Sequence, residues 1–336
     1  MGKLAVVAIG GNSLIKDKRH VDLYSQLATV KETCRQIAEL VQTGWNVAVT
    51  HGNGPQVGFL IRRAELATGE LPLIPLEFAV ADTQGAIGYM IQQSLMNEFW
   101  QRGIARQAVT VVTQVVVDQN DPAFKNPTKP IGSFMTREEA ERHAREDGWT
   151  VVEDAGRGWR RVVPSPEPQK IVEGAAIKDL INAGYIAICA GGGGVPVIER
   201  EGLLEGVAAV IDKDYASSLL ATAIGADLLV ISTGVSRVAI NFGKPDQKEL
   251  DHLTAAEAEA YLAAGHFPPG NMGPKVKAIL RYLGRGGKEG LITSPGELVR
   301  AVEGKAGTRI VAPGRPSATS ADSLFHSMTG ANTTQM

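Results

Sequence analysis

This sequence has few of the features that mark secreted, membrane or zinc-binding proteins. It has only two cysteines, Cys34 and Cys189, and their wide separation indicates core thiols, with neither a disulfide framework nor a zinc site. No run approaches eighteen apolar residues, and the opening MGKLAVVAIGG is too short for the apolar region of a signal peptide. We therefore expect a cytoplasmic protein with no membrane partner.

The sequence also lacks an excess of charge of either sign. Its 36 acidic and 34 basic residues give a formal net charge of −2. That balance provides no broad attraction for nucleic acid or for an anionic membrane, so any anionic ligand must be held by a local site. We expect a small anion as ligand and no nucleic-acid partner.

Several familiar motifs are absent as well. No GxxxxGK[ST] loop occurs, which excludes a P-loop kinase, and no GxGxxG follows an apolar strand, which argues against a nicotinamide-binding domain. HExxH and the EF-hand loop are also missing, so no metal ligand is predicted. Of the six scattered histidines, only His51 lies beside the glycine clusters described below, and a structural role is the simpler interpretation for it.

Apolar strands alternate with amphipathic helices along most of the 336 residues. The pattern predicts strands at 4–9, 46–52, 105–117, 185–190, 227–233, 238–242 and 290–294. It predicts helices at 21–44, 77–102, 171–182, 254–264 and 273–284, and a helical pattern that follows NGPQVG (53–58) and runs through Ala67. This order is typical of an α/β protein with a parallel sheet and crossover helices.

Two segments differ from this pattern. Residues from about 119 to 165 are rich in proline and polar residues, contain the short charged helix TREEAERHARED, and are interpreted as an inserted lid-like subdomain of the 1–312 domain. Residues 313–336 consist mainly of small and polar residues that cannot bury much surface, so a disordered tail is predicted there.

Eight of the 38 glycines form three clusters, each directly after an apolar strand. These are Gly10-Gly11 with Asn12, Gly52-Asn53-Gly54, and Gly191 to Gly194. Any one cluster alone is better explained as a tight turn between a strand and a helix. Together they indicate a phosphate or carboxylate site, because loops at the carboxyl ends of parallel strands form the ligand crevice and glycine lets backbone N–H groups approach an anion.

Three lysines lie on or beside rigid turns. Lys213 is in IDKD between a strand and a helix, Lys275 follows a proline in NMGPKVKA, and Lys129 precedes a proline in NPTKPIG. Each one alone is better explained as a solvated charge than as a catalytic group. A phosphoryl-transfer site without a Walker lysine nevertheless needs such positive charges around the transferring phosphoryl group.

The motifs in combination resemble those of carbamate kinase, a member of the amino acid kinase superfamily. The resemblance covers about residues 3–311 and is carried by AIGGNSL, THGNGPQVG, DTQGAIGY, TQVVVD, FKNPTKPIG, EDAGRGWRRVVPSPEP, GGGGVPV, VIDKDYAS, NFGKPD and GHFPPGNMGPK. FKNPTKPIG and EDAGRGWR belong to the insert that distinguishes carbamate kinase from acetylglutamate, aspartate and uridylate kinases.

This resemblance implies a doubly wound, mostly parallel sheet between helix layers, a protruding subdomain and a homodimer. It implies reversible phosphoryl transfer between ATP and carbamate, giving ADP and carbamoyl phosphate, with Mg²⁺ as cofactor. It also implies that the enzyme makes ATP during the catabolism of amino acids, purines or allantoin. By this resemblance, Lys213 and Lys275 neutralise the phosphoryl group, Lys129 reaches the acceptor side, and Asp214 orients the lysines. The loops that hold the acceptor and the phosphoryl oxygens contain Gly10, Gly11, Asn12, Gly52, Asn53 and Gly54. The residues on the nucleotide side are Asn241, Phe242 and Met272.

Three positions depart from the usual family pattern, namely Ser13, Ser133 and Arg237. None of them replaces a lysine or a paired glycine, so the resemblance still implies activity. Two alternatives stay open at this stage. One is an enzyme of the same fold acting on another small carboxylate, and the other is a non-catalytic sensor of nucleotide or carbamoyl phosphate.

Overall fold

The computed structural model describes residues 2–17, 19–154, 158–268 and 270–312, and the predicted tail from 313 lies outside them. Its centre is an eight-stranded sheet in which most neighbours are parallel and β16 and β17 are antiparallel. In spatial order the strands are β15 (His252–Thr254), β17 (Thr308–Val311), β16 (Glu289–Thr293), β12 (Leu228–Ser232), β1 (Leu4–Ile9), β2 (Asn46–His51), β9 (Ile186–Ile188) and β3 (Ala108–Thr110).

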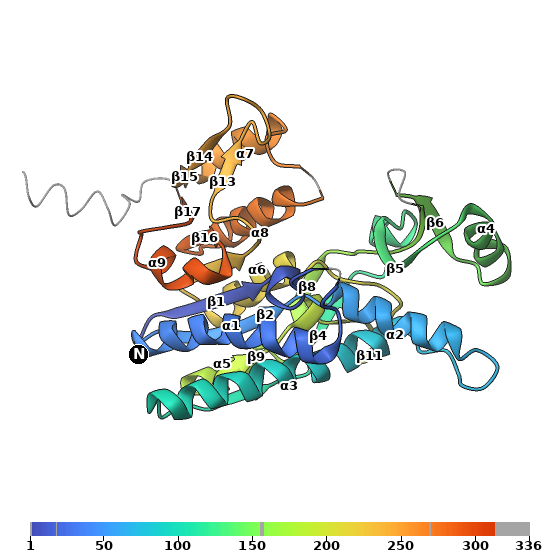
Figure 1. Cartoon of the computed structure of the whole chain (residues 1–336), viewed down its shortest axis with the longest axis horizontal. Helices are drawn as coiled ribbons and strands as arrows, with labels where there is room; N and C mark the ends of the chain where they lie inside the picture. Colours follow the sequence, from blue (N-terminus) through green and yellow to red (C-terminus); the bar gives the residue numbers. More distant parts are fainter. Residues whose placement is uncertain (1, 18, 155–157, 269, 313–336) are drawn as a thin grey trace, which may run out of the picture.

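Alternate residues of the central strands are buried on opposite faces of this sheet. In β1, Val6 and Ala8 pack in one hydrophobic core, whereas Val7 and Ile9 pack in the other. Side chains of a strand alternate between its faces, so a strand covered on both sides reads as a continuous apolar run, as LAVVAI does. The sheet therefore lies between two helix layers (Figure 1).

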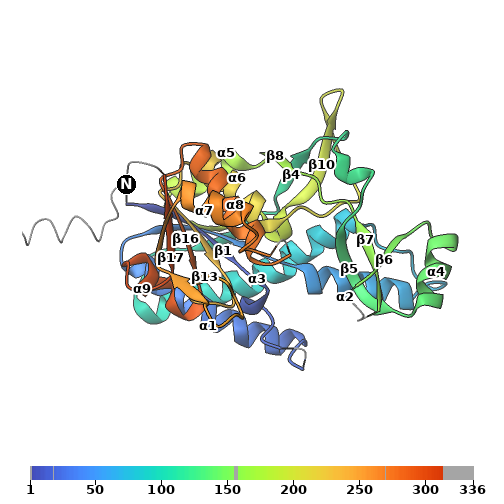
Figure 2. The same cartoon turned by 90° about the horizontal axis from the view of Figure 1, so that it is seen from above.

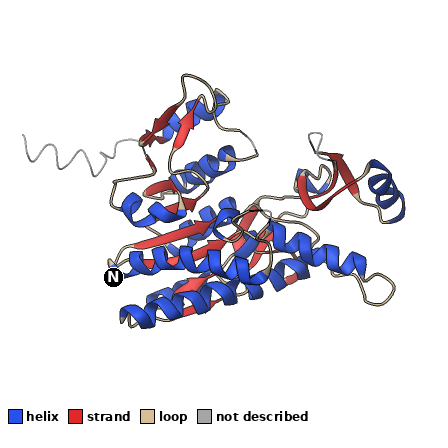
Figure 3. Cartoon of the chain, in the orientation of Figure 1, coloured by secondary structure: helices blue, strands red, loops and turns tan. Residues whose placement is uncertain are grey.

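Figure 3 shows the helices on both sides of the sheet, and each helix layer has its own hydrophobic core. One face is covered by α1 (Leu23–Gln42), α3 (Leu76–Arg102) and α9 (Leu298–Val302). The other is covered by α5 (Gly174–Asn182), α6 (Lys213–Ile224), α7 (Ala255–Ala263) and α8 (Met272–Gly284). Cys34 and Cys189 lie in these two cores as free, buried thiols, which confirms that expectation, and burial raises the pKa of both. No helix in the described part of the chain is long and apolar enough to cross a membrane.

One predicted element is wrong. The β-branched run at 105–117 is not a single strand but is divided into β3 and β4 (Gln114–Val117), which belong to different sheets. The side chain of Gln84 binds the backbone at Thr113, where the chain passes between the sheets. The second sheet has the order β11 (Leu203–Gly206), β10 (Val195–Arg200), β4 and β8 (Pro168–Ile171).

A smaller body projects from the end of the molecule near α2 (Gly54–Leu66). It consists of the antiparallel strands β5 (Lys129–Met135), β7 (Trp159–Val163) and β6 (Thr150–Glu153), with α4 (Arg137–Glu146). We call this body the lid. Figure 2 shows β5 and β7 beside α2, where Ile131 and Val163 pack against Val57 and Ile61. A separate hairpin, β13 (Val238–Ile240) with β14 (Lys248–Leu250), flanks the other end of the central sheet.

Candidate active site

The candidate site lies where β1 and β2 end beside the first turn of α6. The Gly52 N–H donates to the carbonyl of Ile9 at 3.1 Å, which ties the two strand ends together. Helix α6 contacts both strands and packs along α8. The N-terminal turns of α6 and α8 therefore bring their lysines to one place, where unpaired helix N–H groups already favour an anion.

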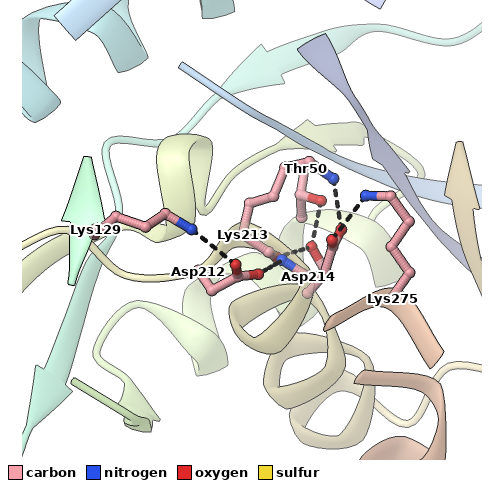
Figure 4. A network of polar contacts seen from close by, with 7 residues as sticks. Thr50, Lys129, Asp212, Lys213, Asp214 and Lys275 are labelled. Carbon is pink, nitrogen blue, oxygen red and sulfur yellow. Dashed lines mark hydrogen bonds and ion pairs between the residues drawn. The ribbon is translucent and has the colours of Figure 1, made fainter. Parts of the chain in front are cut away.

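Lys213 and Lys275 converge on a single carboxylate (Figure 4). The ammonium of Lys213 donates to Oδ1 of Asp214 at 2.5 Å, and that of Lys275 donates to Oδ2 at 3.0 Å. All three side chains are largely buried, with 15%, 13% and 5% of Lys213, Lys275 and Asp214 exposed. The structure thus brings together the residues that the turns IDKD and GPK placed on separate helices.

Burial and charge oppose each other at this cluster. Burial alone would raise the pKa of Asp214, but the two ammonium groups outweigh it and hold that pKa at about 2. Burial lowers the pKa of Lys213, and Lys275 adds to that shift while Asp214 opposes it. Asp214 is therefore ionised and holds two like charges close together.

Lys129 approaches the same site from the lid. Its ammonium donates to Oδ2 of Asp212 at 3.0 Å, and 40% of its side chain is exposed. Asp212 is also the N-cap of α6, because its Oδ1 accepts the Asp214 N–H at 2.9 Å. Sequence reasoning had assigned Asp212 no role. Its position directly before the helix was the available signal for a cap, whereas its ion pair depends on the tertiary fold.

Gly52 provides the space that the stem of Lys213 needs. A methyl group on Gly52 would lie 3.3 Å from Cδ of Lys213, so a larger residue would press on the lysine. On the other side, Thr50 shares a hydrogen bond of 2.6 Å with Ser217, whose hydroxyl donates to the Lys213 carbonyl at 2.6 Å. These two buried hydroxyls were not singled out from the sequence, because Ser and Thr are too common to be distinctive.

The remaining residues of the first two glycine clusters line the ends of β1 and β2. Gly10 faces the Ser232 carbonyl, which would lie 2.9 Å from an added methyl group. Gly11 begins the short 3-10 turn η1 (Gly11–Ser13) and Gly54 begins α2, and a methyl group on either would meet no heavy atom within 4 Å. Asn12 lies in η1, and its side chain is outside the described part of the structure.

The four-glycine cluster has a packing role. It forms the turn η3 (Gly191–Gly193), in which a methyl group on Gly191 would lie 2.4 Å from Nε2 of His51 and one on Gly192 would lie 2.0 Å from Nδ2 of Asn53. Asn53 itself is buried and donates to Thr83 at 2.9 Å. Burial lowers the pKa of His51 to about 4, and Lys213 contributes to that shift, so the ring is neutral near pH 7.

A cavity of about 320 Å³ lies beside the first turn of α8. Met272, the first residue of that helix and part of the cavity lining, is three residues before Lys275. Phe242 and Met272 are among the residues that line the cavity. Asn241 does not belong to its described lining. Its amide donates to Asp246 at 2.7 Å, and its backbone has a φ of 53°, so it shapes the turn after β13.

Arg237 lines the same cavity. Its Nε lies 2.5 Å from Oδ1 of Asp251, and Glu249 is 3.8 Å away, so neighbouring carboxylates balance its charge. Within the described residues, no group of three or more His, Cys, Asp or Glu side chains is gathered for a metal ion. Both oxygens of Asp212 and both oxygens of Asp214 already accept hydrogen bonds.

Comparisons with known proteins agree with this geometry. The model of the amino acid kinase family matches residues 3–294. The carbamate kinase of Thermococcus kodakarensis is 49% identical, over 92% of this chain and 99% of its own length. The carbamate kinase-like protein YahI of Escherichia coli is 52% identical, over 93% of this chain and 99% of its own length. The solved structure of carbamate kinase from Giardia lamblia bound to AMP-PNP is 43% identical, has a TM-score of 0.88, and covers 93% of this chain and 99% of that chain.

Proposed function

We propose that this chain, which belongs to the amino acid kinase family and within it to the carbamate kinases, catalyses reversible phosphoryl transfer between ATP and carbamate. The observation that carries the proposal is the convergence of Lys213 and Lys275 on Asp214. Phosphoryl transfer is catalysed mainly by positioning and charge neutralisation, and two ammonium groups held by one buried carboxylate supply both.

The chemistry needs no general base. An oxygen of carbamate attacks the γ-phosphorus of ATP, the bond to the β–γ bridging oxygen breaks, and ADP leaves with that oxygen. Lys213 and Lys275 neutralise the transferring group, and Lys129 reaches the acceptor side from the lid. Because the carbamate oxygen is already anionic, no proton has to be removed, which accords with a buried, neutral His51 whose Nδ1 lies 3.0 Å from the Gly52 carbonyl.

The substrates have complementary places around this cluster. We assign the acceptor and the phosphoryl oxygens to the loops that contain Gly10, Gly11, Gly52 and Gly54. Gly11 and Gly54 begin a 3-10 turn and a helix, whose first N–H groups suit a small anion, whereas the Gly52 N–H is bonded to Ile9. The nucleotide is assigned to the cavity lined by Phe242 and Met272, since the G. lamblia relative is bound to AMP-PNP and Met272 lies on the same helix as Lys275, three residues before it.

Magnesium fits this site as a partner of the nucleotide. The carboxylates of Asp212 and Asp214 already accept hydrogen bonds from lysines and backbone, so the protein offers the ion few free oxygens. Mg²⁺ commonly binds through substrate phosphates and water, with few protein ligands. When bound, it would neutralise nucleotide charge, while the lysines serve the transferring group.

The proposed physiological direction is formation of ATP. Carbamoyl phosphate is a mixed anhydride, so transfer of its phosphoryl group to ADP is favoured, and a degradative pathway for amino acids, purines or allantoin would supply it. The cytoplasm, which holds the ADP and ATP pools, is the proposed location.

A second copy of the chain is the proposed partner. Phe78, Tyr89 and Trp100 are spaced by eleven residues, which is about three helical turns, so they share one face of α3. Their exposed fractions are 61%, 60% and 72%. An aromatic stripe of this length on a helix near β3, the edge strand of the sheet, supports a homodimer through this face.

The proposal is tested by measuring ATP formed from ADP and carbamoyl phosphate in the presence of magnesium. Activity well above background is expected, and its absence in folded protein would overturn the proposal. Comparing carbamate, acetate and N-acetylglutamate as phosphoryl acceptors from ATP distinguishes a carbamate kinase from an enzyme that phosphorylates another small carboxylate. Tight ADP binding without turnover would identify a sensor.

A further inference from the structure

Asp212 links the lid to the catalytic helix. One of its oxygens caps α6 through the Asp214 N–H, and the other accepts from the lid lysine, Lys129. Its carboxylate is 18% exposed, so it is far less solvated than the lysine. The Asp212 side chain thus contacts both the backbone of Asp214, whose carboxylate holds Lys213 and Lys275, and the ammonium of Lys129.

The two attachments of the lid differ in kind. Its base packs on α2 through apolar side chains, and the backbones approach closely, since a methyl group on Gly58 would lie 3.4 Å from Gly132. The ammonium of Lys129, by contrast, has one hydrogen-bond partner among the described residues, which is Asp212. The lysine can therefore change partners without unpacking the base of the lid.

The charges of the cluster leave room for such an exchange. Asp214 is occupied by two buried ammonium groups, whereas Asp212 is occupied by one partly exposed ammonium group. An anionic substrate entering between them competes with Asp212 for Lys129. It does not compete equally for Lys213, whose stem is confined beside Gly52.

We propose that Asp212 is a positioning residue, the resting partner of the lid lysine, which holds Lys129 at the site in the ligand-free enzyme and releases it to the acceptor side of the bound substrate. This inference rests on the proposed function for the identity of the substrate. It assigns Asp212 a role in the free enzyme that ends once substrate is bound. A purely structural cap would act equally in both states.

Hydrogen exchange of the full-length protein tests this role without requiring turnover. In Asp212→Asn the side chain can still cap α6, because Asn is as good a cap as Asp, but it cannot pair with a lysine. We expect backbone exchange in 129–135 to be about twofold to fivefold faster than in the unmodified protein without ligand, as the loss of one partly exposed ion pair allows. With saturating carbamoyl phosphate and no ADP, the difference should disappear.

Two variants control this experiment. Lys129→Met removes the same pair from the lid side and should give the same faster exchange without ligand, which keeps the test valid if Asp212→Asn folds poorly. Asp22→Asn makes the same chemical change at the cap of α1, where Asp22 accepts from Tyr24 and Ser25, and should leave exchange in 129–135 unchanged. Unchanged lid exchange in Asp212→Asn, or a difference that persists with bound carbamoyl phosphate, would overturn the inference.

Kinetics give a second readout with a definite sign. Because the substrate no longer competes with Asp212 for Lys129, the KM for carbamoyl phosphate should fall about twofold to fivefold in Asp212→Asn, with no rise in kcat. A rise in KM would mean that Asp212 supports the bound state and would contradict the proposal. If the unmodified protein forms no ATP, the proposed function fails, but exchange in the ligand-free protein still decides whether Asp212 holds the lid lysine.

Discussion

Replacing Lys213 by methionine should separate catalysis from stability. Methionine keeps an unbranched stem beside Gly52 but carries no charge, so the transferring phosphoryl group loses one preorganised donor. Removal of one such donor costs about 3–4 kcal/mol of transition-state stabilisation, which corresponds to a fall in kcat of about 10²- to 10³-fold.

The effect of this change on folding should be smaller. Asp214 keeps its hydrogen bond of 3.0 Å to Lys275, so it is not left as an unpaired buried charge, and the desolvation cost of the Lys213 ammonium disappears. We therefore expect the free energy of unfolding to change by less than about 2 kcal/mol.

Two measurements on the same preparation check this prediction. ATP formation from carbamoyl phosphate gives kcat, and urea unfolding gives stability. Lys170→Met is the matched control, because Lys170 forms an exposed pair with Glu199 on β10 and should change stability by no more than about 0.5 kcal/mol and leave activity intact. Lys213→Met with more than a tenth of the original kcat, or with equal losses of activity and stability, would refute the reasoning.

Three further changes have definite expected outcomes. In Gly52→Ala the added methyl group presses on the Lys213 side chain, so kcat should fall about tenfold. The free energy of unfolding measured in urea should change by less than about 1 kcal/mol, and an unchanged kcat would show that the lysine side chain has room to move. The pKa of His51 is 6.5 in the unfolded chain and about 4 in the folded protein, so the unfolded state binds the proton first as the pH falls. About 3 kcal/mol of the free energy of unfolding should therefore be lost between pH 6.5 and pH 4. In urea titrations at several pH values, His51→Gln should reduce this pH dependence. Tyr89→Glu with Trp100→Glu should convert a dimer into a monomer in sedimentation experiments, whereas a dimer that persists would place the interface elsewhere.

Local pattern was sufficient to predict much of the fold. The segments 4–9 and 77–102 were predicted to within a residue of β1 and α3, since β1 is an uninterrupted apolar run and α3 is long. The run at 105–117 misled because β propensity does not show where a chain leaves one sheet for another. That division depends on contacts such as the one between Gln84 and Thr113, which are 29 residues apart.

The candidate site was only partly predictable, for a similar reason. Lys213 and Lys275 could be recognised from the turns beside them, but their common partner becomes visible only when α6 and α8 pack together. The four-glycine cluster suggested an anion site, yet in the structure it makes room for His51 and Asn53. A glycine beside a strand marks a close approach, and the sequence does not say whether a ligand or a side chain approaches.

The burial of each lysine indicates how this site can be both preorganised and able to exchange ligands. Lys213 and Lys275 are 15% and 13% exposed and are fixed by the ionised Asp214, so little reorganisation is needed when charge develops on the phosphoryl group. Lys129 is 40% exposed and pairs with a carboxylate that also caps a helix, so its ion pair is weak enough to be replaced. Three lysines against two aspartates leave one positive charge in excess, and Lys129 of the lid is the most exposed of the three. If the proposed function holds, an anionic substrate that balances this charge is therefore expected to exchange most readily with the ion pair of Lys129.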